Sequence, residues 1–213
     1  MQEEFWHKRW ENNQIGFHQI KPNPFLIEYF SALNVKPHAR IFVPLSGKTL
    51  DISWLLAQGC RVVAIELSQI AVDALIEQLG LQFEISTSGT LTHYYHPQIE
   101  IFSGDFFQLS EAQLGSVNAI YDRAALVALP ENMRSQYAQH LIKITHTAPQ
   151  FLISYEYDQT LFEGPPFCVN RAEVERLYAK DYCLKILFSS SSAQHFNNIE
   201  VQDTVWSLSP HTK

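Results

Sequence analysis

The chain has 213 residues, of which 46% are hydrophobic and 17% are charged, and its formal net charge is −7. This composition supplies a full hydrophobic core, so we expect one folded domain spanning residues 1–213 and no bulk disorder. The acidic balance argues against nucleic acid as a partner, because such a protein needs a basic surface. Glycine is scarce, with 8 residues where about 7% of the chain is usual. Any glycine-rich nucleotide-binding loop must therefore be a sparse one.

The cysteines Cys60, Cys168 and Cys183 are odd in number and widely spaced. Without a C-x-x-C pair they predict neither a disulfide framework nor a zinc site. Cys60 and Cys183 lie in apolar surroundings, which predicts two buried thiols. The first ten residues lack the features of a signal peptide, and no apolar run approaches the ~20 residues that span a membrane. We expect a cytoplasmic protein without a membrane partner.

The first part of the chain carries its aromatic residues in two groups at helical spacing. One group surrounds Trp10 and the other surrounds Tyr29, with Gly16, Pro22 and Pro24 between them as helix breakers. This pattern predicts a helical arm over residues 1–35 that packs on the rest of the domain.

From Arg40 onward, short apolar runs alternate with amphipathic stretches. The predicted strands are 40–45, 61–67, 99–105, 117–123 and 150–158. Predicted helices cover 50–59, 68–80 and about 130–146. Strands that alternate with helices of ten to fifteen residues are typical of βαβ units, whose parallel sheet is covered on both faces.

The end of the chain has a different pattern. A helix over 171–180 is followed by two predicted strands, 183–190 and 199–209, with no helix between them. Such a pair is best interpreted as antiparallel. The predicted fold class is therefore α/β, with a doubly wound, mostly parallel, Rossmann-like sheet of seven strands, an antiparallel last strand and the N-terminal helical arm.

In an open parallel sheet the ligand lies beyond the carboxyl ends of the strands. Glu66 ends the second predicted strand and follows Gly47 by 19 positions, close to the spacing at which an acid binds ribose hydroxyls. A carboxylate has two acceptor oxygens for two neighbouring hydroxyls. The alternative is an acid favoured at a helix N-terminus by the helix dipole.

The loop after the first strand contains Ser46-Gly47-Lys48-Thr49, which ends like a P-loop. The first glycine of that motif is absent, because its position is occupied by Phe42, and Pro44 removes a backbone N–H. A P-loop NTPase remains as an alternative. A single glycine, Gly47, lets a ligand approach but gives few phosphate contacts, which favours a nucleoside-like cofactor without a diphosphate. S-adenosylmethionine is the candidate.

Two further strand ends carry candidate binding residues. Asp105 and Phe106 suit an adenine slot, with a carboxylate for the exocyclic amine and a ring for stacking; the alternative is a turn aspartate beside core phenylalanines. Arg123 follows Asp122 at the end of a buried strand, and its planar guanidinium suits a cofactor carboxylate. A structural pairing of Asp122 with Arg123 is the alternative.

The nine histidines do not form a metal-binding motif. His93 and His96 lie in a predicted hairpin, where we expect both imidazoles to point to solvent rather than to bind a metal. No nucleophile–histidine–acid arrangement is evident, so we assign no metal ligand and no catalytic acid or base.

Several long segments of the chain carry a resemblance to a known family: FWHKRWENNQIGFHQ (5–19), FVPLSGKTLDISWLLAQGCRVVAIELSQIAV (42–72), GDFF (104–107), YDRAALVALPENMRSQYAQHL (121–141) and EGPPFCV (163–169). The W-x-x-R-W start and the P-L-x-G-K-x-L-D loop are the specific parts. In these segments the sequence resembles the thiopurine S-methyltransferase family, class I S-adenosylmethionine-dependent methyltransferases, in its bacterial type. The resemblance implies S-adenosylmethionine as methyl donor, S-adenosylhomocysteine as product, and a small thiol as acceptor.

The family's cofactor contacts fall on Trp10, Leu45, Glu66 and Arg123 in this sequence, and Trp10 is expected to cover the cofactor as part of the arm. The implied reaction is an in-line displacement by a thiol or thiolate, in which the protein mainly positions the reactants and excludes water. Bacterial relatives are also associated with methylation of selenium and tellurium compounds, a metalloid detoxification. A non-catalytic protein that binds an adenosyl ligand remains an alternative. We expect a monomer.

Overall fold

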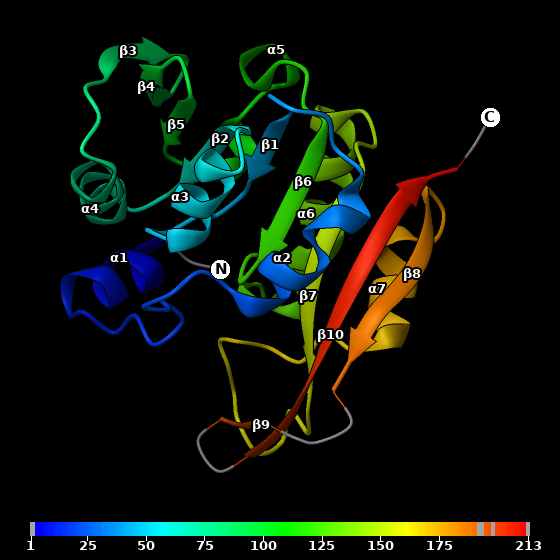
Figure 1. The fold of residues 1–213 in the computed structure, drawn as a ribbon. Helices are drawn as coiled ribbons and strands as arrows, with labels where there is room; N and C mark the ends of the chain where they lie inside the picture. Colours follow the sequence, from blue (N-terminus) through cyan, green and yellow to red (C-terminus); the bar gives the residue numbers. More distant parts are fainter. Residues whose placement is uncertain (1–2, 191–193, 197–198, 212–213) are drawn as a thin grey trace. The chain divides into compact units, whose positions relative to one another are not determined.

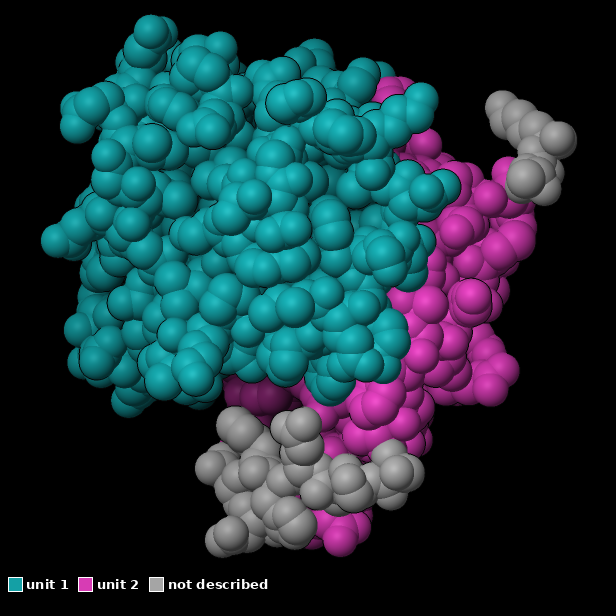
Figure 2. Space-filling model, viewed as in Figure 1, with its two compact units in different colours: residues 1–120 teal, residues 121–213 magenta. Residues whose placement is uncertain are grey.

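The computed structural model describes residues 3–190, 194–196 and 199–211 of the chain. They form two compact units, Met1–Ile120 and Tyr121–Lys213, coloured separately in Figure 2. The boundary between the units falls inside a strand, β6 (Ala119–Arg123), rather than in a loop.

The first unit is built on parallel strands. Strands β1 (Arg40–Val43), β2 (Arg61–Glu66) and β5 (Ile99–Ser103) are parallel neighbours in the order β5-β2-β1. The start of β6 continues this order, because Ile41 pairs with Ala119 in parallel register. The strands are apolar and buried along almost their whole length, as expected for a parallel sheet with covered faces.

Helices connect these strands as predicted. Helix α3 (Leu50–Ala57) begins after Thr49, whose side chain accepts a hydrogen bond from the N–H of Asp51. Helix α4 (Gln69–Leu79) ends at Gly80, which has a φ of 63° in the left-handed region. Helix α3 contacts β2, and α4 contacts both β2 and β5. Each connection is therefore a βαβ unit.

The N-terminal arm is helical. It comprises α1 (Glu3–Glu11), α2 (Pro24–Tyr29) and a 3-10 turn, η1 (Phe30–Leu33), all visible in blue in Figure 1. The arm is attached to the rest of the first unit by several contacts, among them that of α1 with α4 and a 2.6 Å hydrogen bond from the N–H of Asn23 to the buried Asp51 carboxylate. The prediction of a helical arm is confirmed, whereas its role as a cover for the cofactor remains a prediction.

An antiparallel hairpin extends the first unit beyond β5. Strand β4 (Leu91–His96) pairs with β5 and with β3 (Glu84–Ser88), both antiparallel. His93 and His96 lie on β4, which confirms the expected hairpin. The expected solvent-facing orientation of His93 is wrong, because its ring stacks on Phe102 and its side chain is 19% exposed. Two short helical segments follow β5: η2 (Phe106–Gln108) and α5 (Glu111–Leu114).

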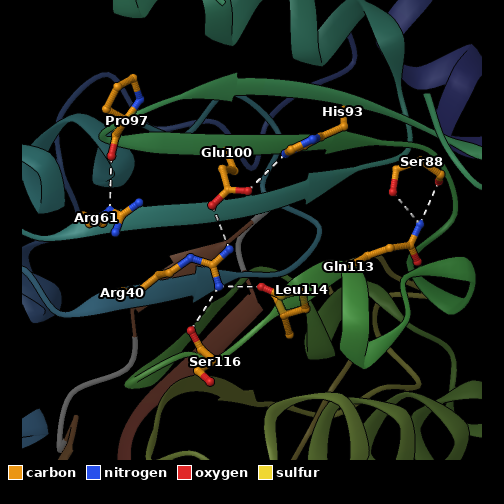
Figure 3. A network of polar contacts seen from close by, with 9 residues as sticks. All are labelled: Arg40, Arg61, Ser88, His93, Pro97, Glu100, Gln113, Leu114 and Ser116. Atoms are coloured by element: carbon orange, nitrogen blue, oxygen red, sulfur yellow. Dashed lines mark hydrogen bonds and ion pairs between the residues drawn. The ribbon is translucent and has the colours of Figure 1, made fainter. Parts of the chain in front are cut away.

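A polar network ties the amino ends of the strands together (Figure 3). Arg40, at the start of β1, donates to the Glu100 carboxylate at 2.8 Å and to the backbone carbonyls of Leu114 and Ser116. Oε2 of Glu100 also lies 3.1 Å from Nε2 of His93 on β4, within hydrogen-bond distance. The network therefore joins β1, β4, β5 and the end of α5 at the edge opposite the carboxyl ends of the parallel strands.

The second unit has mainly antiparallel pairing. Its strand order is β6-β7-β10-β8, with β7 (Gln150–Glu156), β8 (Tyr182–Ser189) and β10 (Ile199–Pro210). Strand β10 is antiparallel to both β7 and β8, and it also pairs with β9 (Gln194–Phe196). The predicted antiparallel pair at the end of the chain is confirmed.

The helices of the second unit are α6 (Glu131–Thr145) and α7 (Arg171–Tyr178), preceded by a 3-10 turn, η3 (Leu126–Ala128). Helix α7 contacts α6 and β8, and Figure 1 shows it beside the β8–β10 pair. The α/β fold class is confirmed. All seven predicted strands are present, and the part of the chain that the structure describes adds β3, β4 and β9.

One burial prediction is wrong. Cys60 is buried, and burial raises the pKa of its thiol, but Cys183 is exposed. Cys183 lies on β8, the last strand in the strand order of its unit, where its Sγ is 3.1 Å from Nδ1 of His211. An edge strand lacks a neighbour on one side, so apolar surroundings in the sequence did not ensure burial there.

Candidate cofactor site

The loop after β1 has a constrained backbone. Leu45 has a φ of 46° and Gly47 a φ of 54°, both in the left-handed region. This conformation is costly for leucine, and such outliers concentrate at ligand-binding sites. The N–H of Ser46 donates to the carbonyl of Ile65 on β2, which anchors the loop at 3.0 Å. The two predicted loop residues, Leu45 and Gly47, thus lie at the carboxyl end of the parallel strands.

Glu66 lies at the end of β2 and is bound to this loop. Its Oε2 accepts a 2.7 Å hydrogen bond from the N–H of Gly47, and its Oε1 accepts a 2.8 Å bond from the N–H of Ser68. The side chain is only 6% exposed. Each carboxylate oxygen can accept more than one hydrogen bond. Glu66 therefore retains acceptor capacity for hydroxyl groups while the backbone fixes its orientation.

Opposing effects act on the pKa of Glu66. Burial raises it above its usual range, whereas the backbone N–H groups of Ser68 and Gly47 and the proximity of His7 counteract that rise. A buried carboxyl group held by backbone donors in this way suits recognition of polar hydroxyls.

Trp10 of the arm lies on Gly47. A β-carbon built on Gly47 would be 3.3 Å from Cζ2 of Trp10 and 3.9 Å from Cε2 of Phe17. The rings of Trp10 and Phe17 meet edge to face, with centroids 5.7 Å apart. Trp10 is 6% exposed. A β-carbon at position 47 would therefore require the Trp10 ring to shift by a few tenths of an ångström, so the arm packs closely on the loop after β1.

Sequence reasoning missed two residues of this cluster, His7 and Phe17. His7 precedes Trp10 by three positions on α1, a spacing that places both on one helix face, and its proximity lowers the pKa of Glu66. Phe17 packs on both Trp6 and Trp10. The helical spacing of His7 and Trp10 was a usable signal, whereas the fold-back that brings in Phe17 follows from the turn after α1.

Asp105 and Phe106 have structural roles in addition to any ligand contact. Asp105 caps η2 by accepting a 3.0 Å hydrogen bond from the N–H of Phe107. Phe106 is buried and stacks on Phe42, with ring centroids 6.5 Å apart. Both follow β5 directly, and the preceding N–H of Gly104 donates to the carbonyl of Glu66. Their place beside the end of β2 suits an adenine slot, which remains a prediction.

Arg123 ends β6 and belongs to the second unit. It is half-buried, and its Nε is buried without a hydrogen-bond partner among the described residues. The neighbouring Asp122 is fully buried and accepts hydrogen bonds from Tyr137, Gln150 and Leu126. An arginine with an unsatisfied donor suits an anionic ligand, because an orphaned buried donor is costly.

These features fit S-adenosylmethionine. The parallel strands end at a buried carboxylate for ribose hydroxyls, one glycine permits close approach, and no phosphate-binding loop is present at 44–49 in the described chain. Arg123 belongs to the second unit, where its buried Nε has no partner among the described residues, and its contact with the cofactor remains a prediction. Every residue predicted for the site other than Arg123 lies in the first unit.

Solved structures share this fold. A didemethyltoxoflavin N1-methyltransferase from Burkholderia thailandensis, crystallised with S-adenosylhomocysteine, matches with a TM-score of 0.65 at 13% identity over 97% of this chain and 87% of that one. A TehB-like S-adenosylmethionine-dependent methyltransferase from Corynebacterium glutamicum matches with a TM-score of 0.57 at 14% identity over 98% of both chains. The fold is that of S-adenosylmethionine-dependent methyltransferases.

The sequence comparisons narrow this class. A family model described as thiopurine S-methyltransferase matches residues 1–209. A thiopurine S-methyltransferase from Acinetobacter baylyi is 58% identical over 98% of both chains, and one from Teredinibacter turnerae is 43% identical over 98% of both. The chain belongs to the thiopurine S-methyltransferase family and is an S-adenosylmethionine-dependent enzyme, which leaves the P-loop alternative without support. Across residues 3–190, 194–196 and 199–211, no helix is long and apolar enough to cross a membrane.

Proposed function

We propose that the enzyme transfers a methyl group from S-adenosylmethionine to the sulfur of a small aromatic or heterocyclic thiol. The observation that carries the use of S-adenosylmethionine is the buried Glu66 carboxylate. It accepts a hydrogen bond from the N–H of Gly47, and Trp10 packs on Gly47. The proposal of a thiol as methyl acceptor is supported by the names of the relatives, which are thiopurine S-methyltransferases.

Each predicted residue has a proposed role in holding the cofactor. Glu66 accepts hydrogen bonds from the ribose hydroxyls, and Leu45 and Gly47 form the wall that the methionine part approaches. Asp105 and Phe106 form the adenine slot. Arg123 binds the carboxylate, and Trp10 covers the bound molecule.

Bound S-adenosylmethionine supplies an electrophilic methyl group on a sulfonium, which a thiolate accepts by in-line displacement. The chain's contribution is to bind, orient and exclude water, which makes the encounter effectively unimolecular. The aromatic arm residues Trp10 and Phe17 suit the exclusion of water, because they pack over the loop after β1. An aromatic thiol is already partly ionised near neutral pH, so we propose no general base.

Turnover with labelled S-adenosylmethionine and a panel of acceptors tests this proposal. The panel contains aromatic thiols, heterocyclic thiols including thiopurines, aliphatic thiols, and selenium and tellurium compounds. Faster methylation of aromatic or heterocyclic thiols supports the proposal. A preference for the selenium or tellurium compounds would instead assign metalloid detoxification as the main role. Cofactor binding without methylated product from any acceptor would support a non-catalytic binding protein.

We also propose that the enzyme works in the cytoplasm as a monomer without nucleic acid. The net charge of −7 supports the absence of a nucleic-acid partner. Light scattering coupled to size-exclusion chromatography measures the mass against the 24.5 kDa of one chain; twice that mass would contradict the proposal of a monomer.

A further inference from the structure

The turn that follows Arg123 is closed by the side chain of the residue before it. Oδ1 of Asp122 accepts a 3.0 Å hydrogen bond from the N–H of Leu126, the first residue of η3. Between them Ala124 has a φ of 60°, a strained value for a residue with a β-carbon. The Asp122 carboxyl group thus bridges the segment that carries Arg123 and holds it in a conformation that alanine does not favour.

Asp122 is itself held from two other elements of the second unit. Its Oδ2 accepts a 2.8 Å hydrogen bond from the hydroxyl of Tyr137 on α6 and a 3.3 Å bond from Nε2 of Gln150 on β7. Burial and the proximity of Asp122 raise the pKa of Tyr137 well above its usual value, so its hydroxyl remains a donor. Asp122, Tyr137 and Gln150 are all 0% exposed.

Asp122 and the adjacent Arg123 differ in their hydrogen bonding. Asp122 accepts three hydrogen bonds from protein groups, whereas the Nε of Arg123 is buried without a partner in the described chain. A carboxylate that paired directly with Arg123 would neutralise it. Instead, Asp122 directs its oxygens to Leu126, Tyr137 and Gln150.

We propose that Asp122 is a positioning residue, which fixes the turn after β6 so that the Arg123 guanidinium is preorganised for the carboxylate of the cofactor. Asp122 does not contact the cofactor in this proposal, and Tyr137 acts by holding Asp122. The inference rests on the proposed function, specifically on the role of Arg123.

Two ligands separate positioning from general stability. S-adenosylhomocysteine carries the amino-acid carboxylate, whereas 5′-methylthioadenosine has the same nucleoside and sulfur without it. Calorimetry on the full chain gives the affinity ratio of the two ligands for each variant. A residue that acts only on stability lowers both affinities together, whereas one that acts through Arg123 lowers the affinity for S-adenosylhomocysteine alone.

Arg123→Met is the reference variant. It is expected to lower the affinity for S-adenosylhomocysteine about 10- to 100-fold, as for a lost charged hydrogen bond. Its affinity for methylthioadenosine is expected to fall less than about 3-fold. Asp122→Ala is expected to show the same selectivity, with a loss of about 10-fold. Asp122→Asn is expected to restore the ratio, because its amide oxygen still accepts from Leu126. The double variant Asp122→Ala/Arg123→Met is expected to lose no more affinity for S-adenosylhomocysteine than Arg123→Met alone.

Tyr137→Phe provides a milder variant in case Asp122→Ala does not fold. It removes one donor to Asp122 and is expected to lower the affinity for S-adenosylhomocysteine selectively, by about 3-fold or more. Tyr182→Phe is the matched control, since it also removes a buried tyrosine hydroxyl of the second unit, one that donates to the carbonyl of Ala148 at 3.0 Å. The control is expected to leave the affinity ratio unchanged.

Two outcomes overturn the inference, and they are distinguishable. If Arg123→Met weakens S-adenosylhomocysteine selectively but Asp122→Ala and Tyr137→Phe do not, Asp122 is no positioning residue although the role of Arg123 stands. If Arg123→Met itself leaves the ratio unchanged, the proposed role of Arg123 fails and the inference fails with it.

Discussion

The backbone N–H of Gly47 donates a 2.7 Å hydrogen bond to Oε2 of Glu66, across 19 residues of sequence. This bond holds the loop after β1 against the end of β2 and fixes the carboxylate proposed to bind ribose. In Glu66→Gln one carboxylate oxygen becomes an amide nitrogen that faces a backbone donor, either Gly47 or Ser68. We expect S-adenosylhomocysteine to bind about 1.5–3 kcal/mol more weakly, as for lost charged hydrogen bonds.

The control for this variant is Glu77→Gln on α4, an exposed glutamate of the same unit. Isothermal calorimetry on both variants measures the difference. Equal affinity in Glu66→Gln and wild type would remove Glu66 from the binding site.

Gly47→Ala tests the contact between the arm and the loop. The new β-carbon meets Cζ2 of Trp10 at 3.3 Å and the backbone has a φ of 54°, so both strain and displacement of the ring are expected. Gly80→Ala has a similar φ of 63° but meets no atom within 4 Å. Strain alone costs about 1 kcal/mol. We expect Gly47→Ala to lose more stability than Gly80→Ala in urea unfolding, together with a change in tryptophan fluorescence. Equal losses would show that Trp10 adapts freely.

The pH dependence of stability reports on Asp122. Burial raises the pKa of this carboxyl group from its ordinary 3.8 to about 6 in the folded protein. The folded state therefore binds the proton more tightly than the unfolded state. The contribution of the Asp122 carboxyl group to the free energy of unfolding accordingly rises as the pH falls from above 6 toward 4.

Asp122→Asn is neutral at every pH, so its comparison with wild type isolates this effect. A shift from 3.8 to about 6 corresponds to about 3 kcal/mol. We expect Asp122→Asn to be more stable than wild type at pH 8 by up to that amount, and the difference to narrow as the pH falls toward 4. Urea unfolding at several pH values measures it, and a constant difference would contradict the raised pKa.

The Arg40–Glu100–His93 network supports stability at the edge opposite the proposed site. Glu100 is 16% exposed in its side chain and pairs with both Arg40 and His93. Glu100→Gln is expected to lower the free energy of unfolding by about 1–3 kcal/mol, since both partners lose a charged acceptor.

The matched control is Glu4→Gln, which breaks the Lys8–Glu4 pair, whose side chains are 64% and 73% exposed. Exposed pairs of this kind contribute about 0.5 kcal/mol or less. Neither variant is expected to change cofactor affinity per folded molecule. A selective loss of affinity in Glu100→Gln would contradict this separation of stability from binding.

The sequence predicted the βαβ arrangement because apolar runs and helical spacing are local signals. Strand β3 was missed, since all but the last residue of Glu84–Ser88 are exposed and no alternation of apolar residues marks it. Helix α5 has only 4 residues, too short for a periodic pattern, although Ser110 and Gln113 form a capping box that signals its start. Exposed edge strands and single helical turns are therefore the parts of the fold that could not be predicted from the sequence.

Only part of the candidate site could be approached from the sequence. The separation of 19 positions between Gly47 and Glu66 indicated a ribose-binding acid, which stays a prediction, but it did not indicate that Glu66 accepts a hydrogen bond from the N–H of Gly47. The partners of Asp122 could not be predicted, because Tyr137 and Gln150 come from other elements, 15 and 28 positions away. A structural pairing of Asp122 with Arg123 was the alternative interpretation, whereas the structure shows Asp122 engaged by neutral donors.

The boundary between the two compact units has a practical consequence for dissecting the enzyme. Because it falls between Ile120 and Tyr121, inside β6, any fragment that ends there divides a buried strand. Each half would expose unpaired backbone groups of β6, which can pair with another chain, together with apolar side chains. The two halves are thus expected to aggregate when produced separately, and to regain a native form only if they are combined, as in a split-protein complementation experiment.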